Sequence, residues 1–145
     1  MNKKVRLCSA CLLGVNCKWN GKNNRNEKVI ELAKKEILIP VCPEQLGGLA
    51  TPRYPSEQRG KKVFMKVDER GVMEATTHFK KGAEEVLKIA ELLGIKEAIF
   101  KQRSPSCGSG QIYDGYFSGT VVKGDGITTA LLKKHGIKVI SEEDL

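Results

Sequence analysis

The sequence predicts a single α/β domain over residues 1–145, with a three-layer, Rossmann-like architecture, a mainly parallel sheet, flanking helices and one or two β-hairpins. Two observations lead to this fold class. Short apolar runs of strand length alternate with longer segments in which apolar residues recur every three or four positions. Such alternation of strands and helices is typical of a parallel sheet that is covered by helices.

The first part of the chain predicts two strands joined by a helix. Lys3–Ser9 has the composition of a short strand, and either Asn24 or Asn26 is placed to cap a helix that ends near Glu36. The apolar run Ile37–Cys42 is typical of a buried strand, which the following proline ends.

A long loop, a hairpin and a second helix follow. Residues 46–60 contain three glycines and two prolines, which predicts a loop of functional length. Val63–Val67 and Val72–Thr76 flank a glycine-containing turn and are expected to pair as a β-hairpin. Apolar residues recur at helical spacing over His78–Leu93, and Gly94 ends that helix.

The last third of the chain repeats the order of strand, loop and helix. Asp114-Gly115 is the expected turn of a second hairpin, and Asp125 is the expected N-cap of the final helix. The segments are a strand at Glu97–Lys101, a loop at 104–110, a hairpin at Tyr113–Val122, a helix at Ile127–Lys134 and a strand at Lys138–Ile140.

The charge balance is basic, with 25 Lys and Arg against 17 Asp and Glu and a formal net charge of +8. Such an excess attracts anionic ligands and supports nonspecific nucleic-acid binding. The basic residues are dispersed, so solvated helix faces explain them better than a nucleic-acid surface. No apolar run approaches the length of a membrane span, and Arg6 interrupts the stretch before Cys11. We therefore expect a cytoplasmic protein without a membrane segment.

Three of the five cysteines stand directly after predicted strands. Cys11 follows the first strand, Cys42 ends the second, and Cys107 lies in the loop after a later one. Ligands of parallel α/β sheets bind at the carboxyl ends of the strands, so these thiols are expected to converge on one metal centre. The alternative is that they are buried packing residues, since free cysteine is among the most buried residue types.

The spacing of the cysteines leaves the metal open. Cys8 and Cys11 have a zinc or redox spacing, but no second CxxC pair accompanies them, and Cys8 fits a structural role equally well. Cys17 is either a spare thiol or a sulfur acceptor. Three thiolates and one open position suit a [4Fe–4S] cluster whose free iron binds a sulfur-containing substrate.

Several longer blocks make the chain similar to a known family. The blocks are Ser9-Ala10-Cys11-Leu12-Leu13-Gly14, Pro40-Val41-Cys42-Pro43-Glu44-Gln45-Leu46-Gly47-Gly48-Leu49, Ser104-Pro105-Ser106-Cys107-Gly108 and Gly124-Asp125-Gly126-Ile127-Thr128. Together they resemble the signature blocks of the DUF523 family, which includes thiouracil desulfurases.

The resemblance implies a cofactor, a reaction and a set of site residues. Family members carry an oxygen-sensitive [4Fe–4S] cluster held by three cysteines, which by position are Cys11, Cys42 and Cys107. Glu44 is implied as an acid/base residue and Ser104 as an active-site hydroxyl. The implied activity is non-redox, hydrolytic removal of sulfur from a thiouracil-like pyrimidine or similar small molecule, with release of hydrosulfide.

The chain departs from the family pattern in one loop. Lys18-Trp19-Asn20-Gly21 stands where Arg-Tyr-Asp-Gly is common, which removes a carboxylate and puts an acid/base role at position 20 in doubt. A second domain that some desulfurases carry has no counterpart in residues 1–145. The resemblance therefore implies the identity of the substrate less safely than it implies the cluster.

Other residues near these blocks are candidate substrate ligands, namely Arg53, Arg103, Ser106 and Gly108. Ordinary surface turns or loop flexibility would account for them nearly as well. Two other functions stay open. The first is a sulfur-transfer protein that carries a persulfide on Cys17 or Cys8, and the second is a non-catalytic metal-site protein whose basic face contacts RNA.

Overall fold

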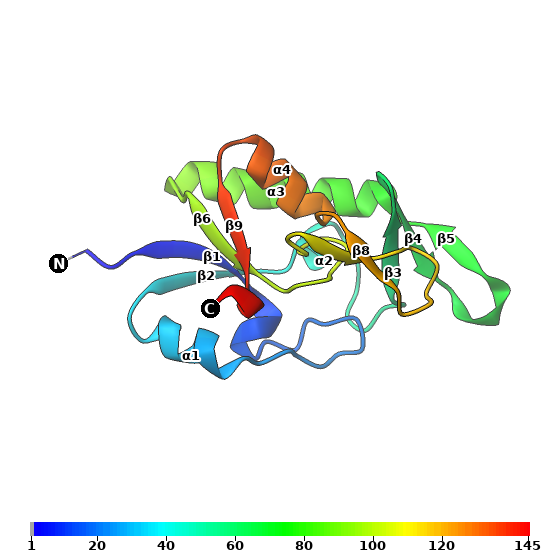
Figure 1. Cartoon of the computed structure of the whole chain (residues 1–145), viewed down its shortest axis with the longest axis horizontal. Helices are drawn as coiled ribbons and strands as arrows, with labels where there is room; N and C mark the ends of the chain where they lie inside the picture. The colour runs from blue at the N-terminus through cyan, green and yellow to red at the C-terminus, as the bar shows by residue number, and fades with distance from the viewer. Residues whose placement is uncertain (1) are drawn as a thin grey trace.

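The computed structural model describes residues 2–145 and places a four-stranded parallel sheet between two helical layers (Figure 1). The strand order is β2-β1-β6-β9, and all three neighbouring pairs are parallel. The bounds are β1 Val5–Ser9, β2 Ile37–Val41, β6 Glu97–Phe100 and β9 Lys138–Ser141. The predicted α/β, Rossmann-like fold class is confirmed.

Alternation along the strands divides the apolar residues between the two faces of the sheet. Leu7 of β1 packs with Val86 of α3 (Thr76–Leu93) and Leu132 of α4 (Ile127–Lys134). Cys8, the next residue, packs with Val29 of α1 (Glu27–Ala33) on the opposite face. This two-residue period explains why the sheet is buried on both sides.

The ends of the helices follow local chemistry, with one correction. Asn26 caps α1 by accepting hydrogen bonds from the N–H groups of Lys28 and Val29. The prediction that Asp125 caps α4 is wrong, because Gly126 occupies the N-cap position. The Asp125 carboxylate instead accepts a hydrogen bond from the Gly110 N–H.

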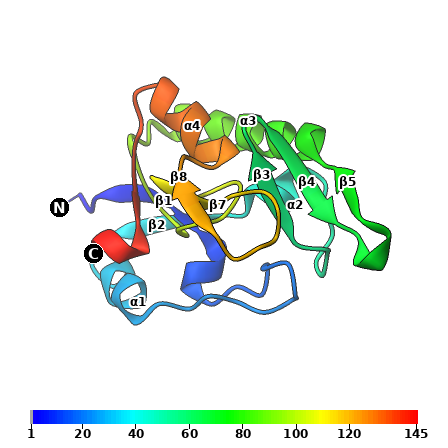
Figure 2. The same cartoon turned by 45° about the vertical axis from the view of Figure 1, so that its right-hand side comes forward.

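Two antiparallel sheets stand beside the carboxyl ends of the parallel strands (Figure 2). The first contains β3 (Ser56–Arg59), β4 (Lys62–Lys66) and β5 (Val72–Glu74), and the second is the hairpin β7 (Gln111–Tyr113) and β8 (Val121–Lys123). Both predicted hairpins are present, but the strands of the second are joined by residues 114–120 and not by a tight turn at Asp114-Gly115.

The loop predicted over residues 46–60 is partly wrong, because β3 forms its last third. β3 has a polar sequence without apolar alternation, and it is a strand because it pairs with β4. A short helix, α2 (Pro43–Leu46), was also not predicted. Within residues 2–145, no helix is long and apolar enough to cross a bilayer.

Candidate active site

A cavity of about 320 Å³ opens beside the carboxyl ends of β1, β2 and β6. Cys11, Cys42 and Cys107 all line it, and so does Cys17. Cys8 does not line the cavity, because its side chain is in the core beneath α1. The topology that places strand ends at one edge therefore brings four of the five thiols to one space.

Cys11 lies in the short 3-10 helix Ala10–Leu13 that follows β1. Its sulfur accepts a hydrogen bond from Asn24 Nδ2 at 3.4 Å, and the Asn24 N–H donates to the Cys11 carbonyl at 2.9 Å. Burial raises the pKa of the Cys11 thiol above its usual range, and the neighbouring Cys42 adds to the effect. Sequence reasoning missed Asn24 as a partner of this sulfur, since it lies in an Asn-rich loop with no distinguishing pattern.

Cys42 and Cys17 form a thiol pair. Cys42 stands at the N-cap of α2, and its thiol donates a hydrogen bond to the Cys17 carbonyl at 3.8 Å. The adjacent Cys17 thiol lowers the pKa of Cys42, and Cys42 in turn raises the pKa of Cys17. The Gln45 N–H and the Arg53 charge also favour the Cys42 thiolate. Of the two thiols, Cys42 therefore has the environment that favours a thiolate ligand.

The loop of Cys107 is held by the first turn of α4. The Ile127 N–H donates to the Pro105 carbonyl at 2.8 Å, and the Thr128 N–H donates to the Ser106 carbonyl at 3.0 Å. These are the N–H groups that a helix start leaves without partners, so α4 needs no side-chain cap. A Cβ on Gly126 would lie 2.4 Å from the Ser106 carbonyl carbon, so the loop requires glycine there. Burial raises the pKa of Cys107.

The carboxylate of Glu44, on α2, is held at both oxygens. Arg53 Nε donates to Oε1 at 2.9 Å, and Ser106 Oγ donates to Oε2 at 3.1 Å. Both Glu44 and Arg53 line the cavity, although their side chains are only 15% and 6% exposed. The carboxylate thus faces the cavity in a fixed orientation, two residues from Cys42.

The hydroxyls of Ser104 and Ser106 extend this arrangement. Ser104 Oγ accepts hydrogen bonds from the N–H groups of Ser106 and Cys107, at 3.2 and 3.1 Å. The Ser104 hydroxyl can therefore donate its own proton to Ser106 Oγ, which lies 3.1 Å away. The Ser106 hydroxyl in turn donates to Glu44 Oε2. The two serines and Glu44 form one directed hydrogen-bond chain beside Cys107.

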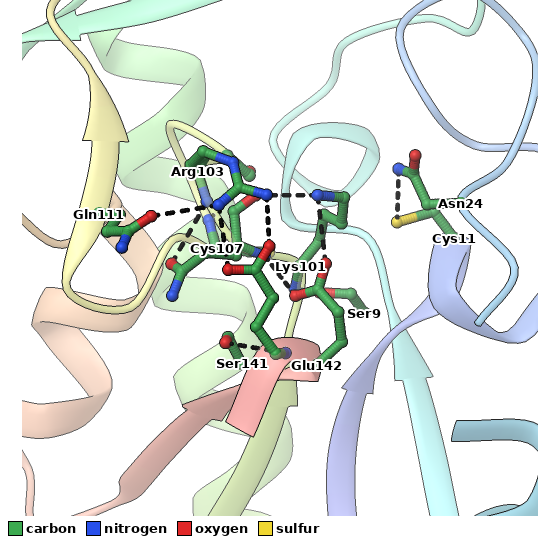
Figure 3. A network of polar contacts seen from close by, with 12 residues as sticks. Ser9, Cys11, Asn24, Lys101, Arg103, Cys107, Gln111, Ser141 and Glu142 are labelled. Atoms are coloured by element: carbon green, nitrogen blue, oxygen red, sulfur yellow. Dashed lines mark hydrogen bonds and ion pairs between the residues drawn. The ribbon is translucent and has the colours of Figure 1, made fainter. Parts of the chain in front are cut away.

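Arg103 lines the cavity but is paired on its outer side (Figure 3). Its guanidinium donates to Gln111 Oε1 at 3.1 Å and forms an ion pair with Glu143. Lys101 forms a second ion pair at the same rim, with Glu142 at 3.2 Å. The final turn of the described chain therefore neutralises two cations next to the cavity.

The remaining predicted residues lie around the cavity or in its supports. Gly108 does not line the cavity, and its N–H donates to the Ser104 carbonyl at 2.9 Å. Asn20 is exposed and accepts a hydrogen bond from the Lys22 N–H at 3.0 Å, an Asx turn that an aspartate would make equally well. Asn20 does not line the cavity, whereas Lys18 and Trp19, the other two residues that differ from the family pattern in this loop, do line it.

The donor set consists of thiols, which are the side chains that hold iron–sulfur clusters. Among residues 2–145, no group of three His, Cys, Asp or Glu side chains is arranged to hold one metal ion. In a [4Fe–4S] cluster each cysteine binds a different iron, so its ligands surround a volume and not a point. Thiols from three separate loops around one cavity meet that requirement.

The fold and the cavity define a class of protein, namely a Rossmann-like α/β domain with a multi-thiol site at the carboxyl edge of its sheet. The chain belongs to the 2-thiouracil desulfurase family, whose model matches residues 7–144. The resemblance to the DUF523 family is thereby confirmed.

Two relatives are similar over nearly the whole chain. The protein YbbK of Bacillus subtilis (strain 168), which is described as uncharacterized, is 40% identical, and the match covers 96% of each chain. The solved structure of TudS, a [4Fe-4S]-dependent thiouracil desulfidase, is 42% identical with a TM-score of 0.89, covering 99% of this chain and 93% of that one.

Proposed function

We propose that this chain is a [4Fe–4S]-dependent desulfurase that removes sulfur hydrolytically from a thiolated pyrimidine or a similar small molecule. The observation that carries the proposal is the cavity that Cys11, Cys42 and Cys107 line together with Glu44 and its serine partners. The likeness to TudS, whose name gives both the cluster and the substrate, supports it.

The proposed cluster ligands are Cys11, Cys42 and Cys107. When bound, the cluster supplies an iron with an open coordination position, a Lewis acid with affinity for sulfur. The Cys11 sulfur already has a donor nearby, the Asn24 side-chain amide at 3.4 Å. Such donors orient thiolate ligands and tune the electronic properties of a bound cluster.

The proposed reaction exchanges sulfur for the oxygen of water. A thiocarbonyl and one water give a carbonyl and hydrogen sulfide, so no electron is gained or lost. Glu44 accepts the proton of the attacking water, because its carboxylate faces the cavity with fixed orientation. The proton then returns to the leaving sulfur from Glu44 Oε2 or through Ser106 Oγ, to which Oε2 is hydrogen-bonded. Ser104 keeps Ser106 in the orientation that this transfer needs.

The test is anaerobic reconstitution with iron and sulfide, followed by incubation with 2-thiouracil. Hydrosulfide and uracil are expected in equal amounts, and Cys107→Ser is expected to abolish both. Cys8→Ala is the matched control, since Cys8 is equally buried but lies outside the cavity. A protein that takes up no cluster, or a loaded protein that releases no hydrosulfide, contradicts the proposal.

Two further measurements separate the proposal from the other functions. Cys17→Ser is expected to retain desulfuration, because Cys17 is outside the proposed ligand set. Its loss of activity with an intact cluster would indicate a persulfide carrier. Salt-dependent retention of RNA by a protein without desulfuration would indicate the RNA-contacting metal-site protein.

A further inference from the structure

Arg53 has the contacts of a group that holds another residue in place. Four hydrogen bonds connect it to the protein, and a guanidinium has five N–H donors in all. They reach Glu44 Oε1 at 2.9 Å, the Ala50 carbonyl at 3.3 Å, Thr51 Oγ1 at 2.9 Å and the Cys17 carbonyl at 2.9 Å. A side chain that is 6% exposed and bonded in this way has little capacity left for a substrate.

These bonds join three segments that meet at the cavity. The Arg53 N–H donates to the Trp19 carbonyl at 2.7 Å, so the backbone and the guanidinium both fix the loop of residues 17–19. The same guanidinium reaches across to Glu44 on α2. Arg53 is therefore itself immobilised before it contacts the carboxylate.

The contact with Glu44 is one half of a two-sided restraint. Arg53 takes Oε1, and Ser106 takes Oε2 from the opposite side of the carboxylate. Ser106 alone would leave the carboxylate free to rotate about its last side-chain bond. With both partners present, Oε2 is kept against the serine chain next to Cys107.

We infer that Arg53 is a positioning residue that fixes the Glu44 carboxylate for proton transfer and does not bind substrate. The inference rests on the proposed role of Glu44. A misplacement of a catalytic group by about 1 Å lowers rates by about 10²-fold, which sets the size of the expected effect. The planar fork of arginine matters here, because separate nitrogens of the guanidinium donate to Glu44 and to the Cys17 carbonyl, whereas lysine has a single nitrogen.

The experiment compares Arg53→Gln and Arg53→Lys with a matched control, Arg6→Gln. Arg6 forms a similarly enclosed pair with Glu36, with side chains 12% and 13% exposed, and it does not line the cavity. We expect Arg53→Gln to lower kcat about 10²-fold, with KM and iron content near those of the unaltered protein. Arg53→Lys should recover part of kcat, and Arg6→Gln should reduce stability alone.

Chemical rescue adds a second readout that a merely structural role would not give. Arg53→Ala opens a space that borders the cavity, so millimolar methylguanidine is expected to restore part of kcat. Arg6→Ala should show no rescue. A raised KM with unchanged kcat in Arg53→Gln would assign Arg53 to substrate binding, and loss of iron would assign it to cluster retention. Either result overturns the inference.

A structural readout separates this inference from the proposed function. In a crystal structure of Arg53→Gln, Glu44 Oε2 is expected to leave Ser106 Oγ, from which it lies 3.1 Å in the unaltered chain. A carboxylate that stays in place overturns the positioning role whether or not the protein releases hydrosulfide. A second outcome is that the unaltered loaded protein releases no hydrosulfide while the Glu44 carboxylate is displaced in Arg53→Gln. This outcome overturns the proposed function and leaves the positioning role of Arg53 intact.

Discussion

The five cysteines occupy environments that differ in whether they favour the neutral thiol or the charged thiolate. Cys8 is fully buried in an apolar core, and desolvation raises its pKa to about 12. Cys42 has the opposite shift, because the Cys17 thiol, the Gln45 N–H and the Arg53 charge favour its thiolate. The same side chain is thus an inert packing group in one place and a ready ligand in another.

This difference predicts selective alkylation of the cluster-free protein. The lowered pKa of Cys42 makes its thiolate more abundant at neutral pH than the thiolate of Cys8, which stays protonated and buried. Limited iodoacetamide at pH 7, followed by peptide mass spectrometry, should label Cys42 well ahead of Cys8. Equal labelling of the two would contradict the assignment, and full labelling after denaturation serves as the control.

At the scale of residues, the sequence indicates the positions of the thiols better than it indicates the hydrogen-bond partners of the site residues. Cys11, Cys42 and Cys107 could be placed because each follows a visible strand, and parallel strand ends share an edge. The partners of Glu44 could not be placed, since Ser106 is 62 residues away along the chain. The sequence predicts a substrate contact for Arg53 for the same reason, because no local pattern reveals that it contacts Glu44.

At the scale of elements, the position of α2 depends on a close crossing with α3. A Cβ on Gly82 would lie 1.9 Å from the Pro43 carbonyl oxygen, and one on Gly47 would lie 2.0 Å from the His78 carbonyl oxygen. Both obstacles are backbone atoms, so neither can rotate away. The crossing fixes the helix that carries Glu44 and follows Cys42.

Gly82→Ala is therefore expected to displace α2 and to impair the site from a distance. Overpacking of this kind costs about 1–3 kcal/mol, and the shift of Glu44 should also lower kcat. Urea unfolding and hydrosulfide release measure the two effects. Lys81→Ala, at an exposed neighbour on α3, is the control and should change neither. Full activity in Gly82→Ala would show that α2 tolerates the displacement.

A second link between elements joins β1 to the segment before β2. Arg6 donates to both carboxylate oxygens of Glu36, at 2.7 and 2.9 Å, and this bond lowers the pKa of Glu36. A carboxyl whose pKa is lower in the folded state stabilises the protein above its unfolded pKa of about 4.3. That stabilisation is lost as the pH falls through the folded value.

Glu36→Gln should accordingly destabilise the protein in a pH-dependent way. At pH 7 we expect a loss of about 2 kcal/mol in the free energy of unfolding, the range for a bidentate bond to a charged group. Below about pH 4 the difference from the unaltered protein should shrink. Urea titrations at the two pH values measure it, and a constant difference would show that the ion pair contributes nothing.

Elements were predictable where the local pattern and the tertiary environment agree. The four parallel strands and the three longer helices have clear apolar periodicity and were found. β3 was missed, because its polar sequence Ser56–Arg59 becomes a strand only through pairing with β4. The cap of α4 was misplaced, because its first N–H groups donate to Pro105 and Ser106, which contact α4 in the fold but lie in an earlier loop of the sequence.

At the scale of the whole molecule, the cavity and the apolar cores are largely separate. One core lies between the parallel sheet and the two helices α3 and α4. A second core lies between the sheet and α1, and a third lies between β4 and α3. Of the cysteines that line the cavity, Cys107 is a buried member of one core and Cys11 packs at the edge of another. Because most residues of these cores lie outside the cavity, we expect the fold to depend little on what the cavity holds, unlike small zinc domains that unfold without their metal.

The cluster-free protein is therefore expected to remain folded and to unfold cooperatively. Reconstitution should raise the melting temperature, because a ligand that binds only the folded state stabilises it. Circular dichroism in the far and near ultraviolet, recorded before and after anaerobic loading, measures both points. Loss of the near-ultraviolet signal together with binding of a hydrophobic dye in the cluster-free protein would show that its cores do not form alone. The three thiols and their cluster would then be required for folding. Cys107→Ser would lose activity because the protein unfolds, and not because a cluster ligand is missing.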